Sequence, residues 1–225
     1  MTLLSEIQEV LERTYRPSGI RLEDCLISAR RSQQLTQCLE QKDHELSPRA
    51  RTYLRQHEGS LYIGLYFDPG LIEELERHDP RQTISHHNIV SLISFIEEIT
   101  HGVHAALAFH AGWRALDSEQ FACNLEMQAR VDTYWVLLRY GRILCDGPIP
   151  EKLRPWIQER LFGDEQTSYA NRGLQRRYLW AREGARCFVG LCERADPKQR
   201  SAWIREFQGL SLLGKKRFLR RHGVL

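Results

Sequence analysis

One short stretch of the sequence carries three side chains whose types and spacing could hold and use a metal ion. It reads FIEEITH over residues 95–101 and lies within a run of apolar residues. Residues four apart share one face of an α-helix, so Glu97 and His101 can contact the same ion. Glu98 can take a proton from a water bound to that ion. The chemistry that these three residues predict is hydrolysis by a metal-activated water.

This stretch resembles the H-E-x-x-H helix of zinc peptidases, with Glu97 in the place of the first His. In gluzincin metallopeptidases a third ligand, a Glu on a second helix, follows about 25 residues downstream, and Glu126 has that spacing from His101. The chain therefore resembles a minimal gluzincin-type zincin over roughly residues 60–140. The resemblance implies Glu97, His101 and Glu126 as metal ligands, Glu98 as the general base, and a peptide or protein as the substrate.

The chain departs from the gluzincin pattern at a second position. Four residues after the ligand Glu, where the family often has an Asp that bonds the first His, this sequence has Arg130. An Arg guanidinium can form a forked pair with a carboxylate, so we expect Arg130 to pair with Glu97. That pairing has two outcomes: Glu97 is oriented as a metal ligand, or it is neutralised and no metal binds.

The implied cofactor is one divalent metal ion. Zinc is the first expectation, and two carboxylates with one imidazole also suit manganese or ferrous iron. Asp132 is expected behind the ligands or at the surface. His104, Tyr134 and Tyr169 are candidates for the contact that stabilises the transition state.

The elements that would position these residues give a predominantly helical α+β fold. A small β element precedes the active-site helix and the glutamate helix, and further helices follow. The turn-rich segment 146–150 suggests a boundary. We expect an N-terminal helical segment over 1–54, a zincin-like core over 55–145, and a helical C-terminal region over 146–225 packed on that core.

Several elements can be predicted individually from periodicity and capping residues. Pro48 is expected to open a helix that carries Tyr53 and Leu54, and Asp117 is expected to cap the glutamate helix. The other expected elements are a helix over 3–15, a strand over 60–67, and helices over 71–77, 89–110, 117–140, 151–161, 168–194 and 197–221, the last interrupted near Gly209 or Gly214.

Two other classes of protein compete with the peptidase. The E-x-x-H unit of Glu98 and His101 also occurs in helical di-iron carboxylate oxidases, although this chain has no second such unit. Alternatively, the protein is a metal-free pseudoenzyme or interaction protein that uses its basic C-terminal helices, which end in KKRFLRRH over 215–222. Nucleic-acid contact through that tail is the less favoured interpretation, because basic residues also stabilise helix C-termini.

Composition narrows the class of protein further. The 225 residues carry a net charge of only +3, with 42% hydrophobic and 27% charged residues, as in an ordinary globular domain. No apolar run is long enough for a membrane span, and the N-terminus lacks the pattern of a signal peptide. The six cysteines contain no C-x-x-C pair and are expected to be reduced and mostly buried, so the expected location is the cytoplasm.

Overall fold

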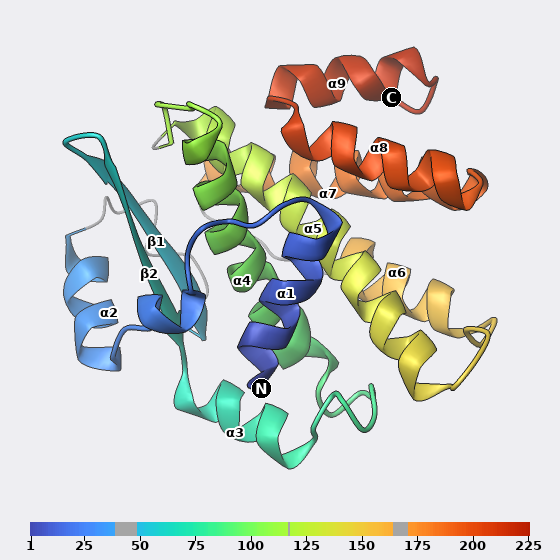
Figure 1. Ribbon diagram of the computed structural model, residues 1–225, viewed down its shortest axis with the longest axis horizontal. Coiled ribbons are helices and arrows are strands. Elements are labelled where there is room, and N and C mark those ends of the chain that lie inside the picture. The colour runs from blue at the N-terminus through green and yellow to red at the C-terminus, as the bar shows by residue number, and fades with distance from the viewer. Residues whose placement is uncertain (39–48, 117, 164–170) are drawn as a thin grey trace.

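The computed structural model describes residues 1–38, 49–116, 118–163 and 171–225, and confirms a predominantly helical α+β fold (Figure 1). Helices α4 and α5 cross at the middle of the molecule, with the β-hairpin on one side and the C-terminal helices on the other. In the described part of the chain the elements are α1 (Leu3–Thr14), η1 (Leu22–Cys25), α2 (Ala29–Gln37), β1 (Ala50–His57), β2 (Ser60–Phe67), α3 (Pro69–Arg77), α4 (Ile89–His110), α5 (Glu119–Leu144), α6 (Leu153–Phe162), α7 (Arg172–Arg194), α8 (Pro197–Gly209) and α9 (Leu212–Arg221).

Helix α4 has the bounds predicted from its apolar pattern, and it is buried on several faces. It packs against α1, α3, α5 and the hairpin, which explains why apolar residues occur almost all round it. The loop before it is held by Asn88, whose side chain accepts from the backbone of Ser85 and donates to the carbonyls of His78 and Thr83. A helix placed in this way carries any polar side chain into the interior.

Helix α5 begins at Glu119, and its N-cap is Ser118, one residue after the predicted Asp117. The Ser118 hydroxyl accepts from the backbone N–H of Phe121 at 3.2 Å, and Asp117 lies outside the described residues. The helix packs between α4 and α7, so it also has buried residues on more than one face. Polar residues on α4 and α5 can therefore meet at the interface between the two helices.

The predicted helix that begins at Pro48 is wrong for Tyr53 and Leu54. Both lie in β1, which pairs antiparallel with β2 in a register that places Tyr53 opposite Gly64. The backbone of 50–57 forms its hydrogen bonds with β2, and the Tyr53 hydroxyl bonds the α2 hydroxyls of Ser32 (2.9 Å) and Thr36 (2.7 Å). Pro48 itself lies outside the described residues. The expected start of the zincin-like core at residue 55 falls within this strand.

The C-terminal helices follow the predicted order, with the last one broken at Leu210 and Ser211 into α8 and α9. One cluster of buried hydrophobic residues runs from Leu4 of α1 to Leu219 of α9. Of the six cysteines, Cys123 and Cys192 are buried and the other four are at least partly exposed, so the expectation of mostly buried thiols was wrong. Within the residues described, no helix is both long and apolar enough to cross a membrane.

Candidate functional site

The structure brings His101 of α4 between two carboxylates. Its Nδ1 lies 3.5 Å from Glu98 Oε2, one turn back on the same helix, and its Nε2 lies 3.7 Å from Glu126 Oε2 on α5. The Thr52 hydroxyl of β1 donates to the backbone carbonyl of Glu98 at 3.0 Å and ties the hairpin to this part of α4. We refer to Glu97, Glu98, His101, Glu126 and Arg130 as the acidic centre.

Glu97 lies beside Arg130, as the sequence predicts, but without the forked hydrogen bonds. The Arg130 Nη1 is 3.8 Å from Glu97 Oε1 and donates instead to the carbonyl of Leu161 at 2.9 Å. Their side chains are 21% and 19% exposed, and those of Glu98, His101 and Glu126 are between 12% and 17% exposed. The acidic centre is therefore mostly enclosed by the two helices but still reaches solvent.

The protonation states in the acidic centre follow from burial and mutual charge. Burial disfavours the imidazolium form of His101, but the Glu126 and Glu98 carboxylates outweigh it and raise the pKa of His101 to about 9. Burial also acts against ionised Glu98, yet its bond to His101 lowers its pKa. For Glu97, burial raises the pKa, and the Arg130 charge offsets this only in part. At neutral pH the protonated His101 imidazole therefore stands beside an ionised Glu98.

Two of the predicted ligand atoms lack a hydrogen-bond partner, and a metal ion would have to displace the proton of His101 to bind its Nε2. His101 Nε2 and Glu97 Oε1 are both buried without a hydrogen-bond partner, a costly state for polar atoms. The donor set of imidazole and carboxylate also suits a divalent ion. The three predicted ligands do not converge, however. Among the residues that the structure describes, no group of three or more His, Cys, Asp and Glu side chains could hold a metal ion as they stand.

The candidates for transition-state contact lie elsewhere. The Tyr134 hydroxyl donates to Glu193 of α7, which also accepts from Arg154 and Gln158. Burial and the bond to Glu193 raise the pKa of Tyr134 well above its ordinary value. Tyr169 lies outside the described residues. The Tyr134 side chain thus joins α5 to α7 through its hydroxyl.

His104 and Asp132 belong to a second polar group, which sequence reasoning did not foresee as a unit. His104 Nε2 lies 2.5 Å from Asp132 Oδ2, and the Tyr15 hydroxyl donates to Asp132 Oδ1 at 2.5 Å. The Gln128 amide donates to both Asp132 oxygens at 3.3 Å. Asp132 is 3% exposed, so it is not a surface acid, and its side-chain hydrogen bonds are to Tyr15, His104 and Gln128.

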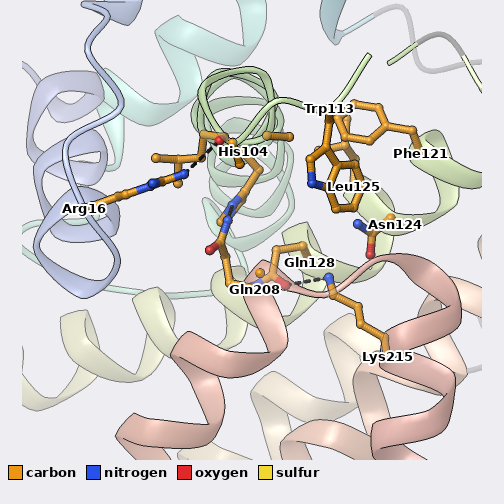
Figure 2. A pocket seen from close by; sticks show the side chains of 13 residues that line it. Arg16, His104, Trp113, Phe121, Asn124, Leu125, Gln128, Gln208 and Lys215 are labelled. Carbon is orange, nitrogen blue, oxygen red and sulfur yellow. Dashed lines mark hydrogen bonds between the residues drawn. The ribbon is translucent and has the colours of Figure 1, made fainter. Parts of the chain in front are cut away.

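The second group continues into the C-terminal helices. The Lys215 ammonium on α9 donates to Gln128 Oε1 at 2.7 Å, as Figure 2 shows. The Gln208 amide of α8 donates to His104 Nδ1 at 3.3 Å, which leaves Nε2 as the nitrogen that donates to Asp132. Burial, with the Asp132 charge, raises the pKa of Tyr15. We call Tyr15, His104, Gln128, Asp132, Gln208 and Lys215 the buried network.

Part of the buried network had a signal in the sequence. Gln128 and Asp132 are four residues apart and share one face of a predicted helix, and His104 lies one turn after His101 on the preceding helix. These spacings could have suggested that the two helix faces pack together. Tyr15 and Lys215 come from opposite ends of the chain, and no spacing rule connects them to the two central helices. Their roles required the tertiary structure.

Comparison of the chain with models of protein families, with curated proteins and with solved structures finds no match. The residues of these two polar groups are therefore the basis for any functional proposal.

Proposed function

We propose that the chain is a metal-dependent hydrolase of the zincin-like kind, acting on peptide or protein substrates at the acidic centre. The observation that carries the proposal is the state of two predicted ligand atoms, His101 Nε2 and Glu97 Oε1, which are buried and have no hydrogen-bond partner. Buried polar atoms are rarely left in this state unless a ligand or a water completes them. Glu126, 3.7 Å from His101 Nε2, is the third proposed ligand.

In this proposal the residues of the acidic centre act as metal ligands, as a general base and as an orienting group. Glu97, His101 and Glu126 would hold a divalent ion, zinc in the first instance, with manganese or iron as substitutes. When bound, such an ion polarises a carbonyl and lowers the pKa of a coordinated water. Glu98, whose pKa is lowered, is ionised at neutral pH and can accept the proton of that water. Arg130 would orient Glu97 through its guanidinium.

A second candidate, a metal-free pseudoenzyme, is favoured by a different observation. Arg130 faces Glu97 at 3.8 Å, and the His101 imidazolium faces two carboxylates, so the positive groups already balance most of the negative charge. A group balanced in this way needs no ion to remain folded. In this case the acidic centre would hold α4 and α5 together, and the function would lie elsewhere in the molecule.

The deciding experiment is the metal content per chain, measured by plasma mass spectrometry on protein purified without a His-tag. Glu97→Ala, His101→Ala and Glu126→Ala are compared with the wild type and with Glu73→Ala, a control at an exposed Glu of α3. We expect about one equivalent in the wild type and the control, and loss in the three variants. Glu98→Gln should retain the ion and lose peptide hydrolysis.

Other outcomes would overturn the proposal in identifiable ways. Two equivalents per chain would point to the di-metal oxidase class. No bound ion after zinc, manganese and ferrous iron are supplied would favour the metal-free pseudoenzyme. Retention of the ion in all three ligand variants would place the metal outside the acidic centre.

A further inference from the structure

A cavity of about 50 Å³ lies between α4, α5 and the segment that joins α8 to α9 (Figure 2). At one end are polar groups of the buried network, among them His104, Gln128 and Lys215. At the other end are Trp113, Phe121 and Leu125, which belong to a small apolar cluster separate from the main core. The cavity therefore combines a polar end with an apolar end, a common arrangement in sites for small molecules.

The charged residues that line this cavity are basic. Lys215 is fully buried, and exposed Arg16 lies at another edge of the cavity, where its Nη2 donates to the Leu107 carbonyl at 3.0 Å. Asp132 is not among the lining residues, and both of its oxygens accept hydrogen bonds within the buried network. Positive charge at the cavity wall is thus not matched by a carboxylate there.

Two polar groups at the cavity lack the partners that burial demands. The Lys215 ammonium has three donors, and among the described residues its one hydrogen bond is to Gln128 Oε1, with the Phe207 ring 4.8 Å away. Asn124, 6% exposed, donates to the Leu210 carbonyl, but its Oδ1 is buried and has no hydrogen-bond partner. A ligand in the cavity would complete both groups.

We propose that this cavity binds a short-chain carboxylate, with the carboxylate on Lys215 and the chain against Trp113, Phe121 and Leu125. One water-sized group occupies about 10–15 Å³ of cavity volume. The cavity of about 50 Å³ therefore has room for about four non-hydrogen atoms, the number in acetate. A hydroxyl on the chain, as in glycolate, could donate to Asn124 Oδ1. The proposal shares no residue with the acidic centre and stands independently of the hydrolase.

The charge state of Lys215 makes the proposed binding depend on pH. Burial lowers the pKa of Lys215 to about 7, although Asp132 acts in the opposite direction. The other titratable groups near it are His104 and Arg16 at the cavity and Cys123, whose thiol burial keeps neutral by raising its pKa to about 11. Above pH 7 the free protein must take up a proton to bind an anion, so affinity should fall about tenfold per pH unit.

The test is calorimetric titration of the full chain with sodium acetate, sodium glycolate and sodium phosphate at constant ionic strength. Lys215→Met removes the ammonium, and Lys216→Met is the matched control, because Lys216 lies over the Trp180 ring and not at the cavity. Ala108→Leu narrows the cavity and leaves Lys215 in place. Thermal unfolding of each variant shows that it is folded.

At pH 6 we expect both carboxylates to bind the wild type and Lys216→Met, with glycolate the tighter. Affinity should fall at least 30-fold in Lys215→Met and Ala108→Leu, and about 50-fold in the wild type between pH 7 and pH 9, because Lys215 is half protonated at pH 7 and about 1% protonated at pH 9. Tighter binding of phosphate than of either carboxylate would overturn the assignment to carboxylates. Absence of binding at pH 6 by the folded wild type, or equal binding by folded Lys215→Met, would overturn the site.

Discussion

The two polar groups on α4 and α5 are close in the sequence and differ in how well their atoms are satisfied. In the acidic centre the opposite charges are 3.5 to 3.8 Å apart, and two ligand-type atoms have no hydrogen bond. In the buried network the contacts of Asp132 with Tyr15 and His104 are 2.5 Å, and Lys215 bonds Gln128 at 2.7 Å. The close contacts around Asp132 rigidify the fold, whereas atoms without partners, in the acidic centre and at the Lys215 edge of the buried network, are typical of sites that await a ligand.

This difference indicates that the buried network mainly stabilises the fold, whereas the acidic centre on the same two helices mainly serves function. Asp132 and its partners connect α1, α4, α5, α8 and α9, so the buried network joins both ends of the chain to the middle. The acidic centre connects mainly α4 with α5 and leaves reactive groups partly exposed. We expect substitutions in the buried network to act on stability first, and those in the acidic centre to act on function first.

The largest effect should come from Asp132→Ala. The substitution leaves the buried donors of Tyr15, His104 and Gln128 without their acceptor, so we expect the free energy of unfolding to fall by about 3–5 kcal/mol. Glu126→Ala, on the same helix and partly exposed, should lower it by about 1 kcal/mol. Urea denaturation followed by circular dichroism measures both values. An equal or larger loss for Glu126→Ala would break the comparison between the two groups.

A smaller effect, with a defined pH dependence, is expected for Lys215→Met. The folded chain holds the pKa of Lys215 at about 7, below its ordinary 10.5, so between these values the unfolded chain binds more protons and wild-type stability rises with pH. Below pH 7 the buried ammonium costs wild-type stability on the order of 5 kcal/mol, since its pKa is lowered from 10.5 to about 7. The substitution removes this cost but leaves Gln128 Oε1 without its donor, which destabilises the variant by about 1–2 kcal/mol. At pH 6 the variant should therefore be the more stable by about 3–4 kcal/mol.

By pH 10 the order should reverse, because the amine is then neutral in the folded chain and little of the cost of burial remains, while its bond to Gln128 is kept. Urea denaturation at pH 6, 8 and 10 gives the three points needed. Lys216→Met should follow the wild type at each pH. A difference between Lys215→Met and the wild type that does not change with pH would show that Lys215 is charged throughout this range.

Sequence reasoning was most successful where a pattern is local. The bounds of α4 follow from its apolar residues, and the order of the C-terminal helices and the break near Gly209 follow from periodicity and from glycine positions. Residues 50–57 were misassigned because their identity as a strand depends on pairing with β2, which a local window does not contain. Asp117 lies outside the described part of the chain, and the cap that the structure gives to α5 is Ser118.

The same limit separates the two polar groups. The members of the acidic centre lie within 97–130. Helical spacing placed His101 near Glu98, and the resemblance to gluzincins, with charge complementarity, placed Glu126 near His101 and Arg130 near Glu97. Spacing did not predict that Arg130 would bond the Leu161 carbonyl, because that contact depends on where α6 packs. The buried network needs Tyr15 and Lys215, which only the tertiary packing of α1 and α9 places beside Gln128.

The smallest predicted effect is the most specific test of the acidic centre, namely the pairing of Glu97 with Arg130. Glu97→His restores the full H-E-x-x-H signature but places a second imidazole beside a guanidinium, and Arg130→Asp leaves Glu97 facing another acid. The double variant restores opposite charges, so we expect a favourable coupling energy of about 1 kcal/mol in urea denaturation. It should also bind zinc more tightly than the wild type, because an imidazole replaces a carboxylate in the ligand set.

The wild type, the two single variants and the double variant form a double-mutant cycle. Its matched control replaces Arg130→Asp by Arg154→Asp, since Arg154 pairs with Glu193 on α7 and not with Glu97. Its coupling energy with Glu97→His should be close to zero, as for sites without a shared partner. If the Glu97→His, Arg130→Asp double variant unfolds as readily as the worse single variant, the two residues do not act as a pair. If it is stable but binds no zinc, the pairing is structural, and the metal-free pseudoenzyme becomes the better account of the acidic centre.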